Sequence, residues 1–138
     1  TGEDETGVAP FKALLAQDAA DILNPDIAGV GGLLDMLEIA GLADGKGVVV
    51  SPHCWNSMTV AASAMMHFCT VIPNPGMAEI YPEYLGHGRL YASAGFEISG
   101  PVARTLDRPG LGASINTAAP DGLSSPHDAS TLAARRMQ

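Results

Sequence analysis

Four titratable side chains recur along this chain at nearly equal intervals, each where a short apolar run ends. Glu3, Asp26, His53 and Glu79 are separated by 23, 27 and 26 residues. An interval of this length holds one strand and one helix, because two parallel strands must be joined by a crossover of about a dozen residues or more. The spacing therefore restricts the chain to a repeated βα architecture with polar residues at the strand ends.

The patterns between these positions support that architecture. Apolar residues recur at helical spacing in some segments, and short β-branched or apolar runs separate them. Parallel strands end at one edge, where (β/α) barrels build their active sites, and such a barrel needs about 250 residues. The 138 residues predict an α/β fold that is half of a barrel. The expected adjacent parallel strands are 21–26, 47–52 and 77–81, and the expected helices are 9–19, 32–45 and 57–71.

Composition excludes several classes of protein. The net charge is -8 with only seven Lys and Arg residues, which argues against a nucleic-acid partner. No segment approaches the roughly 20 apolar residues of a membrane helix, so we expect no membrane span. Two cysteines give no disulfide pattern, which favours a cytoplasmic location. Because the chain begins with Thr1, we expect a fragment or a processed chain.

Three parts are expected along the chain. Residues 1–84 form the barrel half. The segment 85–116 is rich in Gly and Pro and is predicted to be irregular, with strand-like pieces at "FEIS" and "ASIN", and to return over another part of the molecule. Residues 117–138 are expected to form a loose tail.

Asp26 and His53 are candidates for acid/base chemistry. Neighbouring strand ends lie about 5 Å apart, so these two side chains can meet. A carboxylate that accepts from one imidazole nitrogen fixes the tautomer and raises the basicity of the other nitrogen. The alternative is a helix cap for Asp26 and a surface loop for His53. By contrast, His67 and Cys69 lie in an apolar helix and are interpreted as packing residues.

The two glutamates each have two interpretations. Glu3 is either a ligand for a hard cation or, like Asp4 and Glu5, a charge that complements a helix dipole. Glu79 interrupts an apolar run, so its carboxylate either faces a polar cavity or forms a salt bridge on an edge strand. "GVGG" (29–32) lacks the spacing of a dinucleotide loop and is interpreted as a turn.

Several segments together resemble a known family. The chain is similar to the carboxyl-terminal half of the mandelate racemase and muconate lactonizing branch of the enolase superfamily. The similarity covers roughly residues 1–116. The segments that carry it are "TGEDE", "DILNPDIAGVGG", "GVVVSPHCW", "MAEIYPEY" and "DRPGLGASIN", in the family's order.

The resemblance implies a TIM-like (β/α)7β barrel with an α+β capping domain, to which the tail of this half returns through "DRPGLGASIN". Glu3 would be the third Mg²⁺ ligand, at the end of the fifth strand. Asp26 and His53, on the sixth and seventh strands, would form the general acid/base pair. Glu79, on the eighth, would hydrogen-bond the substrate carboxylate or the enediolate.

The implied activity is Mg²⁺-dependent removal of the proton α to a carboxylate, with dehydration of a hydroxy acid or sugar acid as the leading expectation. The alternatives are a racemase or epimerase of a carboxylate substrate, and a non-catalytic truncated half-barrel module. The first four strands, the first two metal ligands and any second-strand base are absent from the sequence. We therefore expect this chain alone to be inactive, with the amino-terminal barrel half and capping domain as its partner, in a complete enzyme that is a homo-oligomer.

Overall fold

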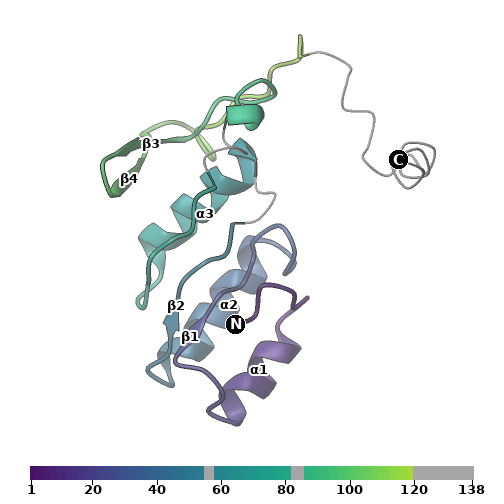
Figure 1. Cartoon of the computed structure of the whole chain (residues 1–138), viewed down its shortest axis with the longest axis vertical. Helices are drawn as coiled ribbons and strands as arrows, with labels where there is room; N and C mark the ends of the chain where they lie inside the picture. The colour runs from purple at the N-terminus through teal and green to yellow at the C-terminus, as the bar shows by residue number, and fades with distance from the viewer. Residues whose placement is uncertain (55–57, 82–85, 120–138) are drawn as a thin grey trace, which may run out of the picture.

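The computed structural model describes residues 1–54, 58–81 and 86–119. Within them, helices alternate with short strands, and a hairpin follows (Figure 1). No helix of this part of the chain is both long and apolar enough to cross a membrane. The elements are α1 (Ala9–Ala16), β1 (Ile22–Leu23), α2 (Leu33–Asp44), β2 (Val49–Val50), α3 (Thr59–Val71), β3 (Phe96–Ser99) and β4 (Val102–Thr105).

The strands β1 and β2 are parallel neighbours, as predicted. Ile22 pairs with Val49, and one further parallel bridge joins Asp26 to His53. The three helices also fall within the predicted ranges, although residue 57, the predicted start of the third, lies outside the described residues. The predicted alternation of helix and strand is therefore confirmed from α1 to α3.

The two strands are shorter than predicted because each is interrupted by a buried proline. Pro25 and Pro52 have no N–H group, so neither can donate to a ladder at its position. Pairing resumes one residue later, where the His53 N–H donates to the Pro25 carbonyl over 3.1 Å. The predicted strands 21–26 and 47–52 are thus each a two-residue strand followed by a bridge.

The prediction of a third strand at 77–81 is wrong, because these residues do not form a regular strand. The parallel bridge to β2 lies earlier, between Val50 and Pro75. In regular pairing, the N–H of residue 78 would donate the next hydrogen bond to the Pro52 carbonyl. The Glu79 N–H donates to this carbonyl instead, over 3.1 Å. One extra residue is therefore accommodated between the two bonds, as in a bulge, and this breaks the ladder.

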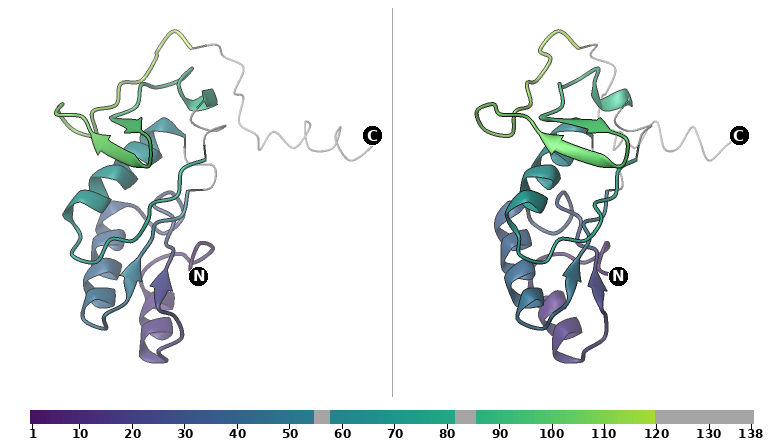
Figure 2. Two further views of the ribbon diagram at one scale, coloured as in Figure 1. Left: turned by 60° about the vertical axis from the view of Figure 1, so that its left-hand side comes forward. Right: turned by 90° about the vertical axis from the view of Figure 1, so that its left-hand side faces the viewer.

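The helices α2 and α3 lie on the same side of β1 and β2 (Figure 2). Lys12 of α1 forms an ion pair with Glu38 of α2 at 2.8 Å, which joins these two helices at the surface. The turn before α2 is the "GVGG" segment, where Gly31 and Gly32 adopt φ values of 130° and 101° that favour glycine. Its interpretation as a turn is confirmed. Side chains from every layer fill the core, among them Phe11, Leu23, Met36, Val50 and Phe68.

The segment after residue 86 contains more regular structure than predicted. "FEIS" is β3, as expected, but it pairs antiparallel with β4, which was not predicted. A two-residue loop, Gly100-Pro101, joins them, and a Gly in the first loop position is typical of such hairpins. "ASIN" is not a strand: within it, Ile115 forms an isolated bridge to Ala92.

Candidate active site

Backbone hydrogen bonds place four segments side by side at one edge of the fold. The Asn24 N–H donates to the Thr1 carbonyl over 2.7 Å, so the chain leading to Glu3 runs beside the chain leading to Asp26. The parallel bridge of Asp26 to His53 adds the third segment, and Glu79 pairs with the residue before His53. The four predicted site residues therefore belong to adjacent segments, in chain order.

Asp26 and His53 are in direct contact. The His53 Nδ1 atom lies 3.0 Å from the Asp26 Oδ2 atom. The other carboxylate oxygen, Oδ1, accepts from the Ala28 N–H at 2.8 Å. Asp26 thus contacts both the turn before α2 and the imidazole. It does not cap α2, whose N-cap residue is Gly32 and which has no side-chain cap hydrogen bond. The Asp26 side chain is 8% exposed and that of His53 is 23% exposed, which leaves the ring partly open to solvent.

Glu79 lies on the opposite side of the imidazole. Its Oε2 atom is 3.8 Å from His53 Nε2 and 3.4 Å from the Cys54 backbone nitrogen. The side chain is 55% exposed, so it belongs to the open side of the site. One imidazole nitrogen thus faces a buried carboxylate and the other an exposed carboxylate.

Glu3 is exposed at the same edge. Its own backbone N–H lowers the pKa of the Glu3 carboxyl, and the charge of His53 contributes to the lowering. The group is thus a charged oxygen donor. Within residues 1–54, 58–81 and 86–119 there is no cluster of three or more His, Cys, Asp or Glu side chains suited to a metal. Glu3 is therefore considered as a single candidate ligand.

Two polar residues near the site were not singled out from the sequence. Asn24 Nδ2 donates to the Ser51 carbonyl over 2.8 Å, and Ser51 Oγ donates to the Met77 carbonyl. Each precedes a proline and then a candidate site residue. That repeated order in "NPD" and "SPH" is the sequence signal that could have identified them.

His67 and Cys69 lie away from this edge, on α3. Both are partly buried, and the His67 Nε2 atom lies inside the protein without a hydrogen-bond partner. Burial raises the pKa of the Cys69 thiol to about 11, so it is neutral at ordinary pH. This agrees with their interpretation as packing residues.

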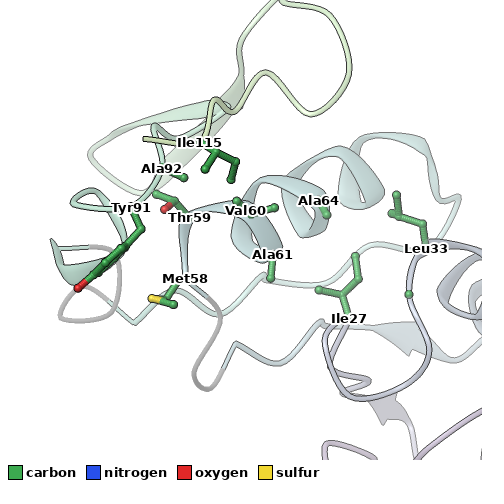
Figure 3. A pocket seen from close by; sticks show the side chains of 12 residues that line it. Ile27, Leu33, Met58, Thr59, Val60, Ala61, Ala64, Tyr91, Ala92 and Ile115 are labelled. Atoms are coloured by element: carbon green, nitrogen blue, oxygen red, sulfur yellow. The ribbon is translucent and has the colours of Figure 1, made fainter. Parts of the chain in front are cut away.

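An apolar cavity of about 630 Å³ lies along the first turns of α3 (Figure 3). Ile27 and Leu33 line one end, and Met58 and Tyr91 line the other. Neither Asp26 nor His53 is among its lining residues. The cavity is therefore distinct from the polar edge.

Comparison with known proteins agrees with this geometry. Residues 1–119 match the family model described as enolase C-terminal domain-like. The chain belongs to this family. The resemblance to the mandelate racemase and muconate lactonizing branch of the enolase superfamily is confirmed.

Individual relatives are named enzymes. The chain is 30% identical over 109 residues to D-galactarolactone cycloisomerase of Agrobacterium fabrum, a match that covers 74% of this chain and 29% of the relative. An enolase from the environmental genome sequencing of the Sargasso Sea has a similar structure, with a TM-score of 0.79 and 45% identity, over 83% of this chain and 31% of that one.

A second solved structure is L-talarate dehydratase from a Polaromonas species, complexed with Mg and L-glucarate. Its TM-score is 0.68 at 30% identity, over 86% of this chain and 30% of that one. The chain thus spans only about a third of the length of the relatives it matches.

Proposed function

We propose that this chain supplies the acid/base segment of a Mg²⁺-dependent enolase-superfamily enzyme that removes the proton α to a carboxylate and dehydrates a hydroxy acid or sugar acid. The observation that carries the proposal is the 3.0 Å contact between His53 Nδ1 and Asp26 Oδ2. An imidazole that donates through Nδ1 presents a basic Nε2 to a substrate. Asp26 then stabilises the imidazolium that forms.

The proposed reaction has two proton transfers. His53 Nε2 takes the α-proton, and the electron pair of the C–H bond moves into an enediolate. The C–O bond to the β-hydroxyl then breaks, and the imidazolium gives its proton to the departing oxygen, which leaves as water. Glu79, 3.8 Å from His53 Nε2, would carry a proton when substrate binds and donate a hydrogen bond to the substrate carboxylate or the enediolate at this position.

The residues at the edge fit one part of a metal site. Glu3 would hold Mg²⁺, because its carboxylate is exposed and its lowered pKa keeps it charged. When bound, Mg²⁺ supplies positive charge that stabilises the oxygens of the substrate carboxylate. The remaining ligands would come from chain outside this sequence, since one carboxylate is not a complete site.

The remaining parts of the proposal concern the whole enzyme. Residues 1–84 would form half of a (β/α)7β barrel, 85–116 would return toward a capping domain, and 117–138 would be a tail. The partner would be the amino-terminal barrel half with the capping domain, and the assembled enzyme would be a homo-oligomer. We expect the isolated chain to be inactive. Its match to about a third of its relatives' length supports this view.

The test is exchange of the substrate α-proton with solvent deuterium, followed by NMR in the assembled enzyme with Mg²⁺ and a set of sugar acids. We expect His53→Asn to abolish exchange and to lower turnover by about 10²-fold to 10⁴-fold. Persistent exchange with lost turnover would make His53 only the acid for the leaving group. Exchange and turnover at wild-type rates would refute the proposal. A product that keeps all its hydroxyls would favour the racemase or epimerase alternative.

A further inference from the structure

The two strands that carry Asp26 and His53 end in the same way. Each has a polar residue, then a buried proline, then the candidate site residue: 24–26 is Asn-Pro-Asp, and 51–53 is Ser-Pro-His. Proline cannot donate a backbone hydrogen bond, so a carbonyl on the adjacent strand loses its regular donor at each place. At each place the side chain of the residue before the proline bonds a carbonyl of the adjacent segment.

Asn24 supplies the missing donor at the first strand. In the parallel ladder, the N–H of residue 25 would donate to the Ser51 carbonyl, but residue 25 is proline. The Asn24 Nδ2 atom donates to that carbonyl instead, over 2.8 Å. The Asn24 backbone N–H donates in the other direction, to the Thr1 carbonyl at 2.7 Å. Asn24 therefore connects the segments that lead to Glu3, Asp26 and His53.

Ser51 has a related place at the second strand. In regular pairing, the N–H of residue 52 would donate to the Gly76 carbonyl, and Pro52 cannot do so. The Ser51 Oγ atom donates to the next carbonyl, that of Met77. This bond spans the extra residue that precedes Glu79, whose N–H bonds the Pro52 carbonyl. The position of Glu79 beside the imidazole therefore depends on Ser51.

We propose that Asn24 and Ser51 are positioning residues. Asn24 supplies the donor that Pro25 lacks, Ser51 bonds the carbonyl next to the one that Pro52 leaves without its regular donor, and these two bonds fix the segment ends that carry Asp26, His53 and Glu79. The 3.0 Å contact of His53 with Asp26 joins two such ends, and a displacement of about 1 Å would disrupt it. The kinetic consequence rests on the proposed function, whereas the effect on the imidazole does not.

The chain offers a matched control in Asn74. Its Nδ2 atom also donates to backbone carbonyls, to Val48 at 2.8 Å and to Ala40 at 3.2 Å. The Val48 bond lies at the opposite, amino-terminal end of β2, and the Ala40 bond reaches α2. Asn74→Leu thus removes the same kind of bond from the same strand without touching the end that carries His53.

The kinetic experiment uses the assembled enzyme. Asn24→Leu is expected to lower kcat about 10-fold to 100-fold with KM changed less than about threefold, because the acid/base pair is misaligned. Ser51→Ala is expected to raise KM about tenfold with kcat nearly unchanged, because Glu79 would contact the substrate carboxylate. Asn24→Gln, which keeps an amide donor, should recover part of kcat. Asn74→Leu should leave kcat within about twofold of wild type.

A second measurement needs no turnover. In the 138-residue chain, ¹⁵N NMR of the His53 ring reports the fraction protonated at Nδ1, which Asn24→Leu should lower and Asn74→Leu should not. An Asn24→Leu variant with unchanged tautomer and unchanged kcat overturns the proposal. Equal losses in Asn74→Leu would also overturn it, since reduced stability would then explain both. The two proposals can also be told apart. If Asn24→Leu changes the tautomer of His53 while the wild-type enzyme dehydrates no acid, the positioning role is supported and the proposed function is refuted.

Discussion

The region 1–81 and the region 86–119, in the parts that the structure describes, are held in different ways. In the first, side chains from helices and strands pack into one continuous core, and the buried residues include Leu23, Met36 and Phe68. In the second, among the residues that the structure describes, the buried hydrophobic side chains are Ala92 and Phe96. The second region is fastened to the first through α3.

A hydrogen bond joins the second region to α3 of the first. The Gly95 N–H donates to the Ser63 hydroxyl of α3 over 2.9 Å. Within the second region, a Cβ atom at Gly95 would lie 1.7 Å from the Leu111 carbonyl oxygen, so only glycine fits there. The difference teaches where chemistry can be placed. The candidate site residues lie at the polar edge of the densely packed region, where the backbone beneath them is fixed.

The largest expected effect is on stability, and it sharpens the contrast. Phe68→Ala removes a ring that is 1% exposed in α3 and should lower the free energy of unfolding by about 3–5 kcal/mol. Leu90→Ala, in the second region at 54% exposure, should cost less than about 1 kcal/mol. Urea denaturation of both variants measures this. Phe96 of the second region joins the same buried cluster as Phe68, so equal losses would show that the second region is packed against this cluster as densely as the first.

The next effect concerns chemistry in the same two regions. Asp26→Asn should lower turnover of the assembled enzyme by about 10²-fold, because an amide stabilises the imidazolium poorly and disturbs the tautomer. Its fold should persist, since the amide oxygen can still accept from the Ala28 N–H. Asp107→Asn, an exposed carboxylate of the second region, is the control and should have no effect. Similar losses in both variants would count against a special role for Asp26.

A smaller effect is expected at the proposed metal ligand. Glu3→Gln should weaken Mg²⁺ binding by about tenfold, measured by calorimetry in the assembled enzyme, because a neutral amide replaces a charged oxygen donor. Asp4→Asn should leave the affinity nearly unchanged. If both substitutions weaken Mg²⁺ binding equally, Glu3 is not a metal ligand and the acidic turn acts only as a helix cap.

The smallest effect tests the junction through Cys69, which lines a groove shared by α3 and the hairpin. Its pKa is about 11 in the folded chain against 9.0 for an ordinary thiol. Folding favours the neutral thiol. Its contribution to the free energy of unfolding is therefore complete below pH 9 and is lost as the pH rises toward 11. We expect a loss of about 1 kcal/mol, reduced because the side chain is only partly buried.

The measurement is urea denaturation at pH 8 and pH 10.5, with Cys69→Ala as the reference. That variant should lose less stability between the two pH values than the parent chain. An identical loss in both would mean that the thiol is solvated and that the hairpin does not cover it.

Much of the first region could be predicted from local sequence. Helices need only short-range periodicity, so α1, α2 and α3 were found within a few residues of their bounds. The spacing of Asp26 and His53 placed them on neighbouring parallel segments, since that interval holds one strand and one helix. Glu3 and Glu79 lie on the adjacent segments, which are not strands. The turn at Gly31 and Gly32 followed from composition alone.

Other features were decided by tertiary contacts. The strand 77–81 fails as a ladder because one extra residue must be accommodated between two bonds to β2, and no local pattern reveals that offset. The strand β4 pairs only because β3 lies beside it. The sequence by itself determined which residues could carry chemistry and in what order along the edge. Only the tertiary structure decided that Asp26 contacts His53 at 3.0 Å while Asn24 and Ser51 bridge the strands, because such distances depend on register between segments about 27 residues apart.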